Sequence, residues 1–340
     1  MTSSAAPPGA PLALTMGEPA GVGGETTLRA WLRRGDIPSF FAIDDAERLR
    51  RVAHDLGIDA PVRTVTAPDE APEVFPDAVP VLHQSLPADP VPGRPDPANA
   101  RAVVASIETA VRLARGGAAA GVVTNPISKE TLYGAAFTFP GHTEFLGALA
   151  GDRTTPVMML ACAELRVVPV TIHVSLAEAI RTLDTGRIVG TAAITAEALT
   201  GDFGIARPRL AVAGLNPHAG EGGAMGHEDA EIVAPVVAEL RARGIDAFGP
   251  APPDTLFAPG ARSGYDAAIC MYHDQALIPL KTLDFDGGVN VTLGLPFVRT
   301  SPDHGTAFDI AGTGRAREGS LVAALRMAAA IAAQRAAARL

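Results

Sequence analysis

The chain has 340 residues, which is enough for about two domains and for a core that needs no disulfides. Its 28 lysines and arginines face 37 aspartates and glutamates, and the net charge of −9 has the wrong sign for a surface that binds nucleic acid. Hydrophobic residues make up 47% of the chain, which excludes disorder, yet no apolar run reaches the roughly 18 residues of a membrane span. We therefore expect a soluble, globular protein that binds neither nucleic acid nor membrane.

The N-terminus and the cysteines bear on the cellular compartment. The opening MTSSAAPPGAP has neither the basic start nor the apolar core of an export signal. Cys162 and Cys270 lie far apart in the chain and among apolar residues, as reduced thiols in a protein core do. We expect a cytoplasmic location on these grounds.

The N-terminal part alternates strand and helix patterns. Apolar runs predict buried strands, and amphipathic runs predict helices. The strands are expected at PLALT (11–15), FFAI (40–43) and VRTVT (62–66), and the helices at TTLRAWLRR (26–34) and DDAERLRRVAHDLG (44–57). Nine prolines between Pro68 and Pro97 predict a long surface excursion, with at most an edge strand at VPVLH (79–83).

The alternation resumes at Asn99, which is the expected N-cap of a helix over 101–117. Further apolar runs predict strands at AAAGVVT (118–124), PVMML (156–160), LRVVPVTI (165–172), RLAVAGL (209–215) and DAAICMY (266–272). Helices are expected over 175–183, 187–199, 228–243 and 320–340. Continuous apolar strands separated by helices predict an α/β fold whose sheet is covered on both faces.

A glycine-rich loop, GEPAGVGGE (17–25), follows the first predicted strand. Such a loop can cradle a phosphate, but this one lacks the GxGxxG spacing and the GK[ST] ending of nucleotide loops. The alternative is a tight strand-to-helix turn, for which glycine is routinely used. Both interpretations stay open from the sequence alone.

Two further loops, TNPISKE and PGHTE, carry groups that suit an anion. Two hydroxyls can donate hydrogen bonds and two basic side chains can add charge toward a phosphate or carboxylate. These groups are Ser128, Thr143, Lys129 and His142. The alternative is that Ser128 caps a helix while Lys129 is solvated.

Three histidines follow apolar runs: His173 after VPVTI, His218 in GLNPHAGEGG and His273 in CMYHDQ. At equivalent ends of parallel strands they would converge on one edge of the sheet. Three imidazoles bind a borderline divalent cation such as Zn²⁺ and leave a position open for substrate. Each histidine could instead be a structural residue, and the absence of HExxH argues against a zinc protease.

The stretch from Lys281 through GGVNVTLGLPFVRTSPDHGTAFDIAG is dense in polar groups and has little periodicity, which predicts binding loops. Arg299 suits bidentate recognition of a carboxylate or phosphate, and Lys281 offers a point charge. The alternative is a pair of surface cations.

These motifs, in this order, resemble the 4-hydroxythreonine-4-phosphate dehydrogenase family of vitamin B6 biosynthesis, over nearly the whole chain. The resemblance implies two α/β domains of the isocitrate and isopropylmalate dehydrogenase type with an active-site cleft between them, and not a Rossmann fold. The expected domains are 1–125 plus 300–340, on the cofactor side, and 126–299, with metal, substrate and dimer contacts. It also implies a homodimer whose active sites lie at the subunit interface.

The resemblance assigns roles to individual residues. It implies His173, His218 and His273 as ligands of a divalent metal (Zn, Mg or Co) shared between subunits. The implied substrate-binding residues are His142, Thr143, Lys281, Asn290 and Arg299. Asp254 matches a cleft carboxylate, and Asp254 and Lys281 are both candidates for the catalytic base. HGTAFDIAG resembles an adenine-binding loop, which implies His304, Gly305 and Asp309 as residues that bind NAD.

The implied reaction is the metal-dependent oxidation of 4-phosphooxy-L-threonine by NAD⁺ and its decarboxylation to 3-amino-2-oxopropyl phosphate. One alternative is a related dehydrogenase for a phosphorylated sugar acid, such as threonate or erythronate 4-phosphate, or for an aromatic-derived diol carboxylate. Alternatives of a different class are a metal-dependent hydrolase and a phosphate-ligand binding protein. We expect NAD rather than NADP, because the Asp309 carboxylate would accept hydrogen bonds from ribose hydroxyls and repel a 2′-phosphate.

Overall fold

The computed structural model describes residues 9–133, 137–139, 141–151 and 154–338. The chain forms two compact units: unit 1 comprises Met1–Pro156 and Leu295–Leu340, and unit 2 comprises Val157–Gly294. The predicted boundary between residues 125 and 126 falls inside unit 1. The reason is that Leu132, Phe145 and Leu146 pack in the same apolar core as Val103 and Ile107.

Unit 1 is built on a parallel sheet of six strands in the order β3-β4-β2-β1-β5-β12. The strands are β1 (Leu12–Thr15), β2 (Phe40–Asp44), β3 (Val62–Val65), β4 (Val79–His83), β5 (Val122–Thr124) and β12 (Arg299–Pro302). Strands β1 and β2 are fully buried, as expected of a parallel sheet covered on both faces. The loops after β1 and β5 leave the sheet at the same edge, because these two strands are adjacent and parallel.

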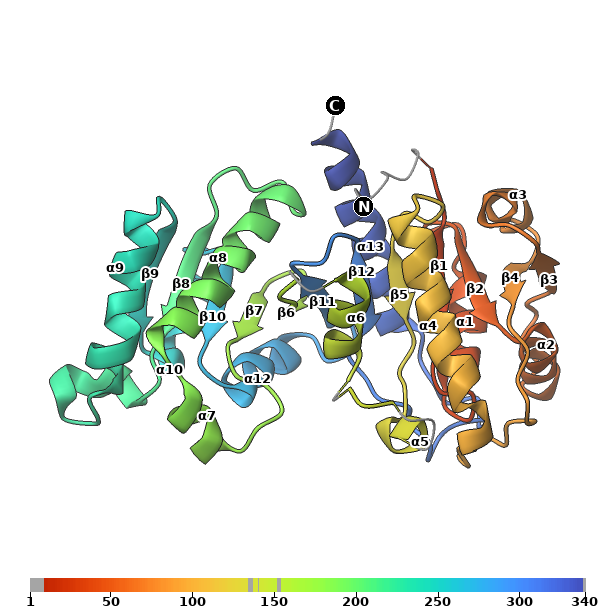
Figure 1. The fold of residues 1–340 in the computed structure, drawn as a ribbon, viewed down its shortest axis with the longest axis horizontal. Helices are drawn as coiled ribbons and strands as arrows, with labels where there is room; N and C mark the ends of the chain where they lie inside the picture. The colour runs from red at the N-terminus through yellow and green to blue at the C-terminus, as the bar shows by residue number, and fades with distance from the viewer. Residues whose placement is uncertain (1–8, 134–136, 140, 152–153, 339–340) are drawn as a thin grey trace. The chain divides into compact units, whose positions relative to one another are not determined.

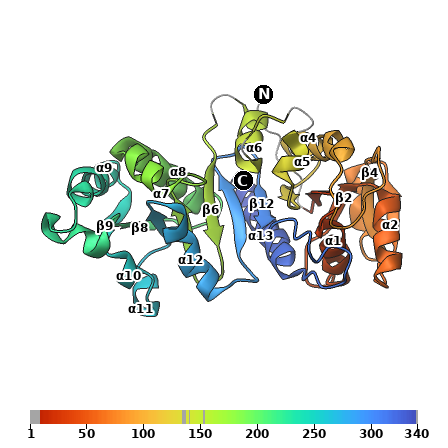
Figure 2. The same ribbon diagram turned by 90° about the horizontal axis from the view of Figure 1, so that it is seen from below.

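Helices cover both faces of this sheet, with α4 on one face and α1 and α13 on the other (Figure 2). The helices are α1 (Gly23–Leu32), α2 (Ala46–Asp55), α3 (Ala71–Val74), α4 (Ala100–Arg115), α5 (Lys129–Tyr133), α6 (His142–Ala150) and α13 (Gly319–Ala337). Short 3₁₀ turns precede α3 and α4, as η1 (Pro68–Glu70) and η2 (Pro97–Asn99). The sequence sets the start of α2 locally, since the Asp45 carboxylate accepts hydrogen bonds from the backbone of Glu47 and Arg48.

Unit 2 has a mixed sheet in the order β11-β6-β7-β10-β8-β9 (Figure 1). Its strands are β6 (Val157–Ala161), β7 (Arg166–Pro169), β8 (Arg209–Ala213), β9 (Asp246–Ala251), β10 (Ala267–Cys270) and β11 (Val289–Leu293). Strand β6 runs antiparallel to both of its neighbours, whereas β7, β10, β8 and β9 are parallel. The carboxyl ends of β7, β10 and β8 therefore share one edge.

The helices of unit 2 lie on both faces, with α8 and α9 on one and α12 on the other (Figure 2). They are α7 (Leu176–Thr182), α8 (Thr185–Gly201), α9 (Ala234–Ala242), α10 (Pro253–Leu256), α11 (Pro259–Arg262) and α12 (His273–Leu283). Two irregular turns, η3 (Pro217–Gly223) and η4 (Asp229–Val233), connect β8 to α9. No helix in the described part of the chain combines the length and apolar character needed to cross a membrane.

The predicted α/β class is confirmed, and four local predictions need correction. Strand β4 lies between β2 and β3 rather than at an edge. The helix expected over 228–243 begins as the π turn η4. The stretch after Lys281 contains β11 and β12, which alternation failed to reveal because both strands are buried nearly throughout. Strand β9 and helix α12 were not predicted, and α12 was obscured by an internal proline, Pro279.

Candidate functional site

The three predicted metal ligands all follow the shared edge of the unit 2 sheet, and two of them are neighbours. His173 follows β7 and His273 begins α12 directly after β10. Their ring centroids are 5.8 Å apart. Two imidazoles on one tetrahedral zinc ion, with Zn–N bonds of about 2.0–2.1 Å, place their centroids roughly 5 to 6 Å apart. The pair therefore fits two ligands of a single metal ion.

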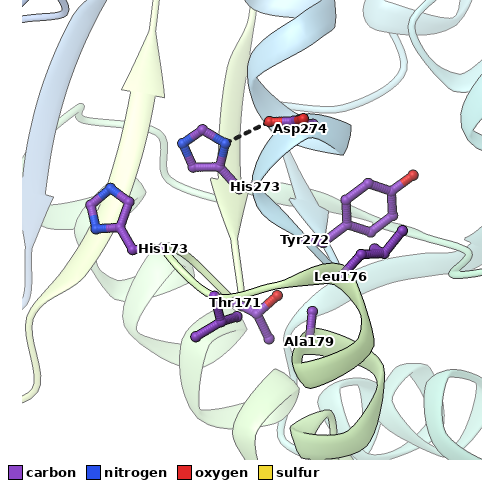
Figure 3. A pocket seen from close by; sticks show the side chains of 8 residues that line it. Thr171, His173, Leu176, Ala179, Tyr272, His273 and Asp274 are labelled. Atoms are coloured by element: carbon purple, nitrogen blue, oxygen red, sulfur yellow. Dashed lines mark hydrogen bonds and ion pairs between the residues drawn. The ribbon is translucent and has the colours of Figure 1, made fainter.

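The surroundings of this pair also suit metal binding. Nδ1 of His273 lies 2.7 Å from Oδ1 of Asp274, a contact that orients the ring and leaves Nε2 available as a ligand. Figure 3 shows both imidazoles projecting beside a cavity of about 250 Å³ whose lining includes Thr171 and Tyr272. A cavity next to these two imidazoles leaves room for a small molecule.

His218 lies apart from this pair within the chain. Its nearest acidic partner is Asp254, with Nδ1 and Oδ2 3.9 Å apart, and both side chains are more than half exposed. No group of three histidines, cysteines or carboxylates in the described residues of one chain could hold a metal ion. The structure thus brings His173 and His273 together and places His218 with Asp254, the predicted candidate base.

The backbone at these histidines is strained. His173 has a φ of 24° and His218 a φ of 51°, in a region that non-glycine residues rarely adopt. Ala219 and Glu221 share this feature beside His218. Such conformations cost of order 1–3 kcal/mol each and concentrate at functional sites. Two of the five non-glycine residues with positive φ in the described structure are therefore predicted metal ligands.

Unit 1 holds a cluster of predicted anion-binding groups. Arg299, only 3% exposed, donates a hydrogen bond from Nη2 to Oγ1 of Thr124 at 2.7 Å. Burial lowers the pKa of Arg299 to about 10, so the side chain stays charged at neutral pH. His142 is the first residue of α6, and burial, followed by the charges of Arg299 and Lys129, holds the pKa of its imidazole well below the usual range. His142 is therefore neutral beside two cations.

The start of α6 adds to this anion site. The helix is preceded by Gly141, and no side chain caps its first turn, so the backbone N–H groups around His142 and Thr143 can meet an anion. Nε2 of His142 is buried and has no hydrogen-bond partner among the described residues. Ser128 instead serves as a helix cap, since its Oγ accepts a hydrogen bond from the backbone N–H of Thr131 at 3.3 Å.

The glycine-rich loop connects β1 to α1 and packs against the loop after β5. The backbone N–H of Glu18 donates to the carbonyl of Pro126 at 2.8 Å. Gly17 has a φ of 66°, and a Cβ there would lie 2.7 Å from Cβ of Asn125, so only glycine allows this approach. Burial raises the pKa of the Glu18 carboxyl. Helix α1 begins at Gly23, three residues before the predicted start at Thr26.

The other predicted site residues lie on well-defined elements. Lys281, on α12, holds its Nζ 5.6 Å from the centre of the Phe285 ring. Asn290, on β11, has a buried Oδ1 without a hydrogen-bond partner among the described residues. In HGTAFDIAG, Nδ1 of His304 lies 2.9 Å from the carbonyl of Gly305, while Nε2 is buried and unpartnered in the described structure. Asp309 is exposed.

Two residues of these sites, Lys129 and Asp274, are not among the site residues expected from the sequence. Lys129 was noted as a basic group, but only the structure places its charge where it acts on His142. Asp274 orients His273, and its position directly after the histidine was the available signal.

Comparisons with known proteins identify the family of this chain. The model of the family described as pyridoxal phosphate biosynthetic protein PdxA matches residues 36–328. A 4-hydroxythreonine-4-phosphate dehydrogenase of Caulobacter vibrioides is 56% identical over 331 residues, which are 96% of this chain and 98% of the relative.

Solved structures show the same likeness. The crystal structure of 4-hydroxythreonine-4-phosphate dehydrogenase from Klebsiella pneumoniae has a TM-score of 0.85 and 40% identity, covering 95% of this chain and 99% of that one. A terephthalate 1,2-cis-dihydrodiol dehydrogenase from Burkholderia xenovorans has a TM-score of 0.63 and 30% identity, covering 94% and 98%. The family match and the identity extend over nearly the full length, and the chain therefore belongs to the PdxA family of pyridoxal phosphate biosynthetic proteins.

Proposed function

We propose that this chain is a 4-hydroxythreonine-4-phosphate dehydrogenase that uses NAD⁺ and a divalent metal in the biosynthesis of pyridoxal phosphate. The identity of 56% to the Caulobacter enzyme over nearly the whole of both chains carries this proposal. A dehydrogenase needs an NAD(P) cofactor, which a hydrolase or a phosphate-binding protein does not. The neighbouring imidazoles and the buried Arg299 could supply groups that such an oxidation requires.

The reaction removes a hydride and a proton from a secondary alcohol beside a carboxylate. The hydride passes to the nicotinamide, the hydroxyl proton goes to a base, and the β-keto acid then loses CO₂. Asp254 and Lys281 are the candidates for the base. Asp254 is more than half exposed beside His218, so a bound substrate can reach its carboxylate.

The anionic groups of the substrate meet cations and N–H donors of this chain. Arg299, fixed by Thr124, can form two parallel hydrogen bonds to a phosphate or carboxylate. Neutral His142 can donate or accept a hydrogen bond without adding to the positive charge already supplied by Arg299 and Lys129. Lys281, Asn290 and Thr143 complete the proposed set.

His173, His218 and His273 are the proposed metal ligands. The 5.8 Å separation of two of these rings fits imidazole donors to one ion. When bound, a divalent metal acts as a Lewis acid toward the hydroxyl and carbonyl oxygen of the substrate. Asp274 holds His273 in the orientation that frees Nε2 for this role.

A homodimer is the proposed assembly, with the metal ligands shared between its subunits. Most of the large apolar side chains that the described structure exposes lie in unit 2, and Val174, Leu176 and Ile180 flank His173. On α12, Ile278 is 63% exposed. An apolar surface next to an incomplete ligand set is typical of an interface. Sedimentation should show a dimer for the wild type, and Ile278→Glu should weaken it; a monomer with full specific activity would contradict the proposal.

One assay tests the proposed function. Purified protein is mixed with a divalent metal, NAD⁺ and 4-phosphohydroxythreonine, and NADH absorbance is followed. We expect NADH to form only with metal present. If NADH forms instead with threonate 4-phosphate, erythronate 4-phosphate or a diol carboxylate, the substrate is wrong and the reaction type stands. No NADH with any of these compounds would refute a dehydrogenase.

The proposed compartment is the cytoplasm. Both cysteines, Cys162 and Cys270, are buried and free, and burial raises the pKa of the Cys270 thiol. Two buried cysteines that form no disulfide are typical of a protein in a reducing compartment.

A further inference from the structure

The turn that carries His218, η3 (Pro217–Gly223), runs through left-handed backbone. Five consecutive residues, from His218 to Gly222, have φ values between 41° and 79°. Non-glycine residues rarely adopt this region, and here His218, Ala219 and Glu221 all do. Such a run is not stable by itself, because each left-handed L-residue costs free energy. Packing and hydrogen bonds from other parts of the chain must therefore hold this turn.

A buried carboxylate, Asp229, holds the backbone that leads into the turn. Its side chain is only 2% exposed. Its Oδ1 accepts a hydrogen bond from the backbone N–H of Leu215 at 2.7 Å. Its Oδ2 accepts hydrogen bonds from the backbone N–H and from Nδ2 of Asn216, each at 3.0 Å. Both carboxylate oxygens thus bind the segment just before His218, and hydrogen bonds to a charged acceptor are stronger than those between neutral groups.

The backbone that follows His218 packs against the same side chain. A Cβ at Gly220 would lie 3.4 Å from Cβ of Asp229. A Cβ at Gly214 would lie 2.9 Å from Cα of Ala219 and 3.0 Å from Oδ1 of Asp229, so only glycine allows this close approach. Asp229 is also the first residue of the π turn η4, and such turns are frequent at functional sites. The carboxylate therefore contacts the chain on both sides of His218.

The strand end before the turn is tied to the segment that carries His273. Oε1 of Gln275 accepts a hydrogen bond from the backbone N–H of Met271 at 2.6 Å, and its Nε2 donates to the carbonyl of Gly214 at 2.7 Å. The ends of β8 and β10 are therefore fixed to each other, and the two strands also pair directly. Because this base is fixed, the direction of the His218 side chain depends on the turn that Asp229 holds.

We propose that Asp229 is a positioning residue for the metal ligand His218, because its buried carboxylate holds the left-handed turn and so fixes where the imidazole points. This inference rests on the proposed function in one respect, that His218 binds the metal. Asp229 acts through the backbone of Leu215 and Asn216, since both of its oxygens are engaged there. A turn that is ordered before the metal arrives avoids the entropy cost of ordering the ligand on binding.

Asp229→Asn tests this in the intact protein, with Zn²⁺ as the probe. The amide has only one acceptor oxygen, so an N–H group of Leu215 or Asn216 loses its acceptor. We expect the Zn²⁺ dissociation constant, measured by competition with a chelating dye, to rise about ten- to a hundredfold, as for other residues that orient a metal ligand. In the metal-free protein, amide hydrogen exchange over residues 214–225 should become faster. A wild-type dissociation constant in this variant would overturn the proposal.

Asp266→Asn is the matched control, because Asp266 holds the opposite end of the same strand. Its Oδ2 accepts a hydrogen bond at 2.7 Å from the backbone N–H of Arg209, the first residue of β8. This variant should unfold at a lower temperature while its Zn²⁺ dissociation constant stays within about twofold of the wild type. If Asp266→Asn lost as much zinc affinity as Asp229→Asn, general destabilisation would explain both losses and the proposal would be overturned.

A milder variant serves if Asp229→Asn does not fold. Asn216→Ala removes only the side-chain donor to the carboxylate and leaves both backbone hydrogen bonds in place. The Zn²⁺ dissociation constant should then rise by about three- to tenfold, as expected for the loss of one hydrogen bond to a charged group. An unchanged dissociation constant in Asn216→Ala would also count against the positioning role.

The His218→Ala background separates positioning from stability. If Asp229 acts through His218, adding Asp229→Asn to His218→Ala should change the Zn²⁺ dissociation constant by less than about twofold. A further loss in the double variant as large as that of Asp229→Asn alone would overturn the positioning role. An unchanged dissociation constant in His218→Ala would refute the proposed ligand set and this inference together. A loss in His218→Ala without one in Asp229→Asn would overturn the inference alone.

Discussion

Units 1 and 2 present their chemical groups in opposite ways. In unit 1, Arg299 is buried and the pKa values of Arg299 and His142 are lowered by that burial. In unit 2, the side chain of His218 is 57% exposed and lies beside an exposed carboxylate. The exposed side chains of Val174 and Leu176 line the same cavity as His173. Unit 1 thus holds its predicted anion-binding groups, Arg299 and His142, away from solvent. In unit 2 the predicted metal ligands His173 and His218 are exposed, and their backbone has positive φ.

This difference indicates which site each unit can complete from its own residues. Desolvation strengthens electrostatic interactions, so the buried Arg299 of unit 1 can attract an anion strongly. The described residues of unit 2 bring only two of the three predicted ligands together. An exposed, incomplete ligand set beside an apolar surface requires a second element to cover it, which is why we propose a dimer.

The largest effect is expected in unit 2. His173→Ala or His273→Ala should lower kcat/KM at least about a thousandfold, because a metal that acts as a Lewis acid supplies several kcal/mol of transition-state stabilisation. Metal content, measured by mass spectrometry, should fall with activity. His54→Ala, a change at an exposed position on α2, serves as the control. Full activity in either variant would show that the exposed imidazoles of unit 2 are structural.

A smaller effect should distinguish charge from geometry in unit 1. Arg299→Lys keeps the positive charge but loses the planar fork, so kcat/KM should fall by roughly tenfold or more. Steady-state kinetics over a range of substrate concentrations checks this. Arg50→Lys on the surface of α2 is the matched control. A kcat/KM equal to that of the wild type would mean that Arg299 is a structural cation rather than an anion-binding residue.

The cofactor preference should respond to a single exposed carboxylate in unit 1. Two like charges about 4 Å apart repel by about 1 kcal/mol even when fully solvated, so wild-type kcat/KM should favour NAD⁺ over NADP⁺ by about fivefold or more. In Asp309→Asn the preference should narrow to within about twofold. Equal use of both cofactors by the wild type would defeat this assignment and leave the metal ligands unaffected.

The buried imidazole of unit 1 should make stability depend on pH. Burial depresses the pKa of His142 in the folded protein, so below about pH 6.5 the unfolded chain binds a proton that the folded chain does not. The free energy of unfolding should then fall with decreasing pH, by up to about 1.4 kcal/mol per pH unit from this residue. Urea unfolding at pH 7.5 and pH 5.5 should show a smaller loss in His142→Gln. An identical pH dependence in both proteins would argue that the imidazole is solvated.

Much of the fold could be predicted because the pattern is local. Buried strands such as β1, β2 and β10 appear as unbroken apolar runs, and the predicted N-cap position of α4 at Asn99 is correct. However, the Asn99 side chain does not cap the helix as expected. The Asn99 side chain accepts a hydrogen bond from the backbone of Ala88 instead of capping the helix. A side chain's partner can lie anywhere in the chain, so residue type at a helix end does not determine it.

The sequence by itself determined the α/β class, the candidate histidines, the anion-binding loops and the family, since these rest on residue types in a fixed order. Only the tertiary structure shows that β4 is an interior strand. The order of strands in a sheet depends on which strands pair with each other, and the local sequence pattern does not determine that pairing. Tertiary structure alone set His173 beside His273, through the adjacency of β7 and β10. It alone buried the carboxylate of Asp229 against the backbone that leads to His218, since burial is a property of the packing around a residue and not of the residue.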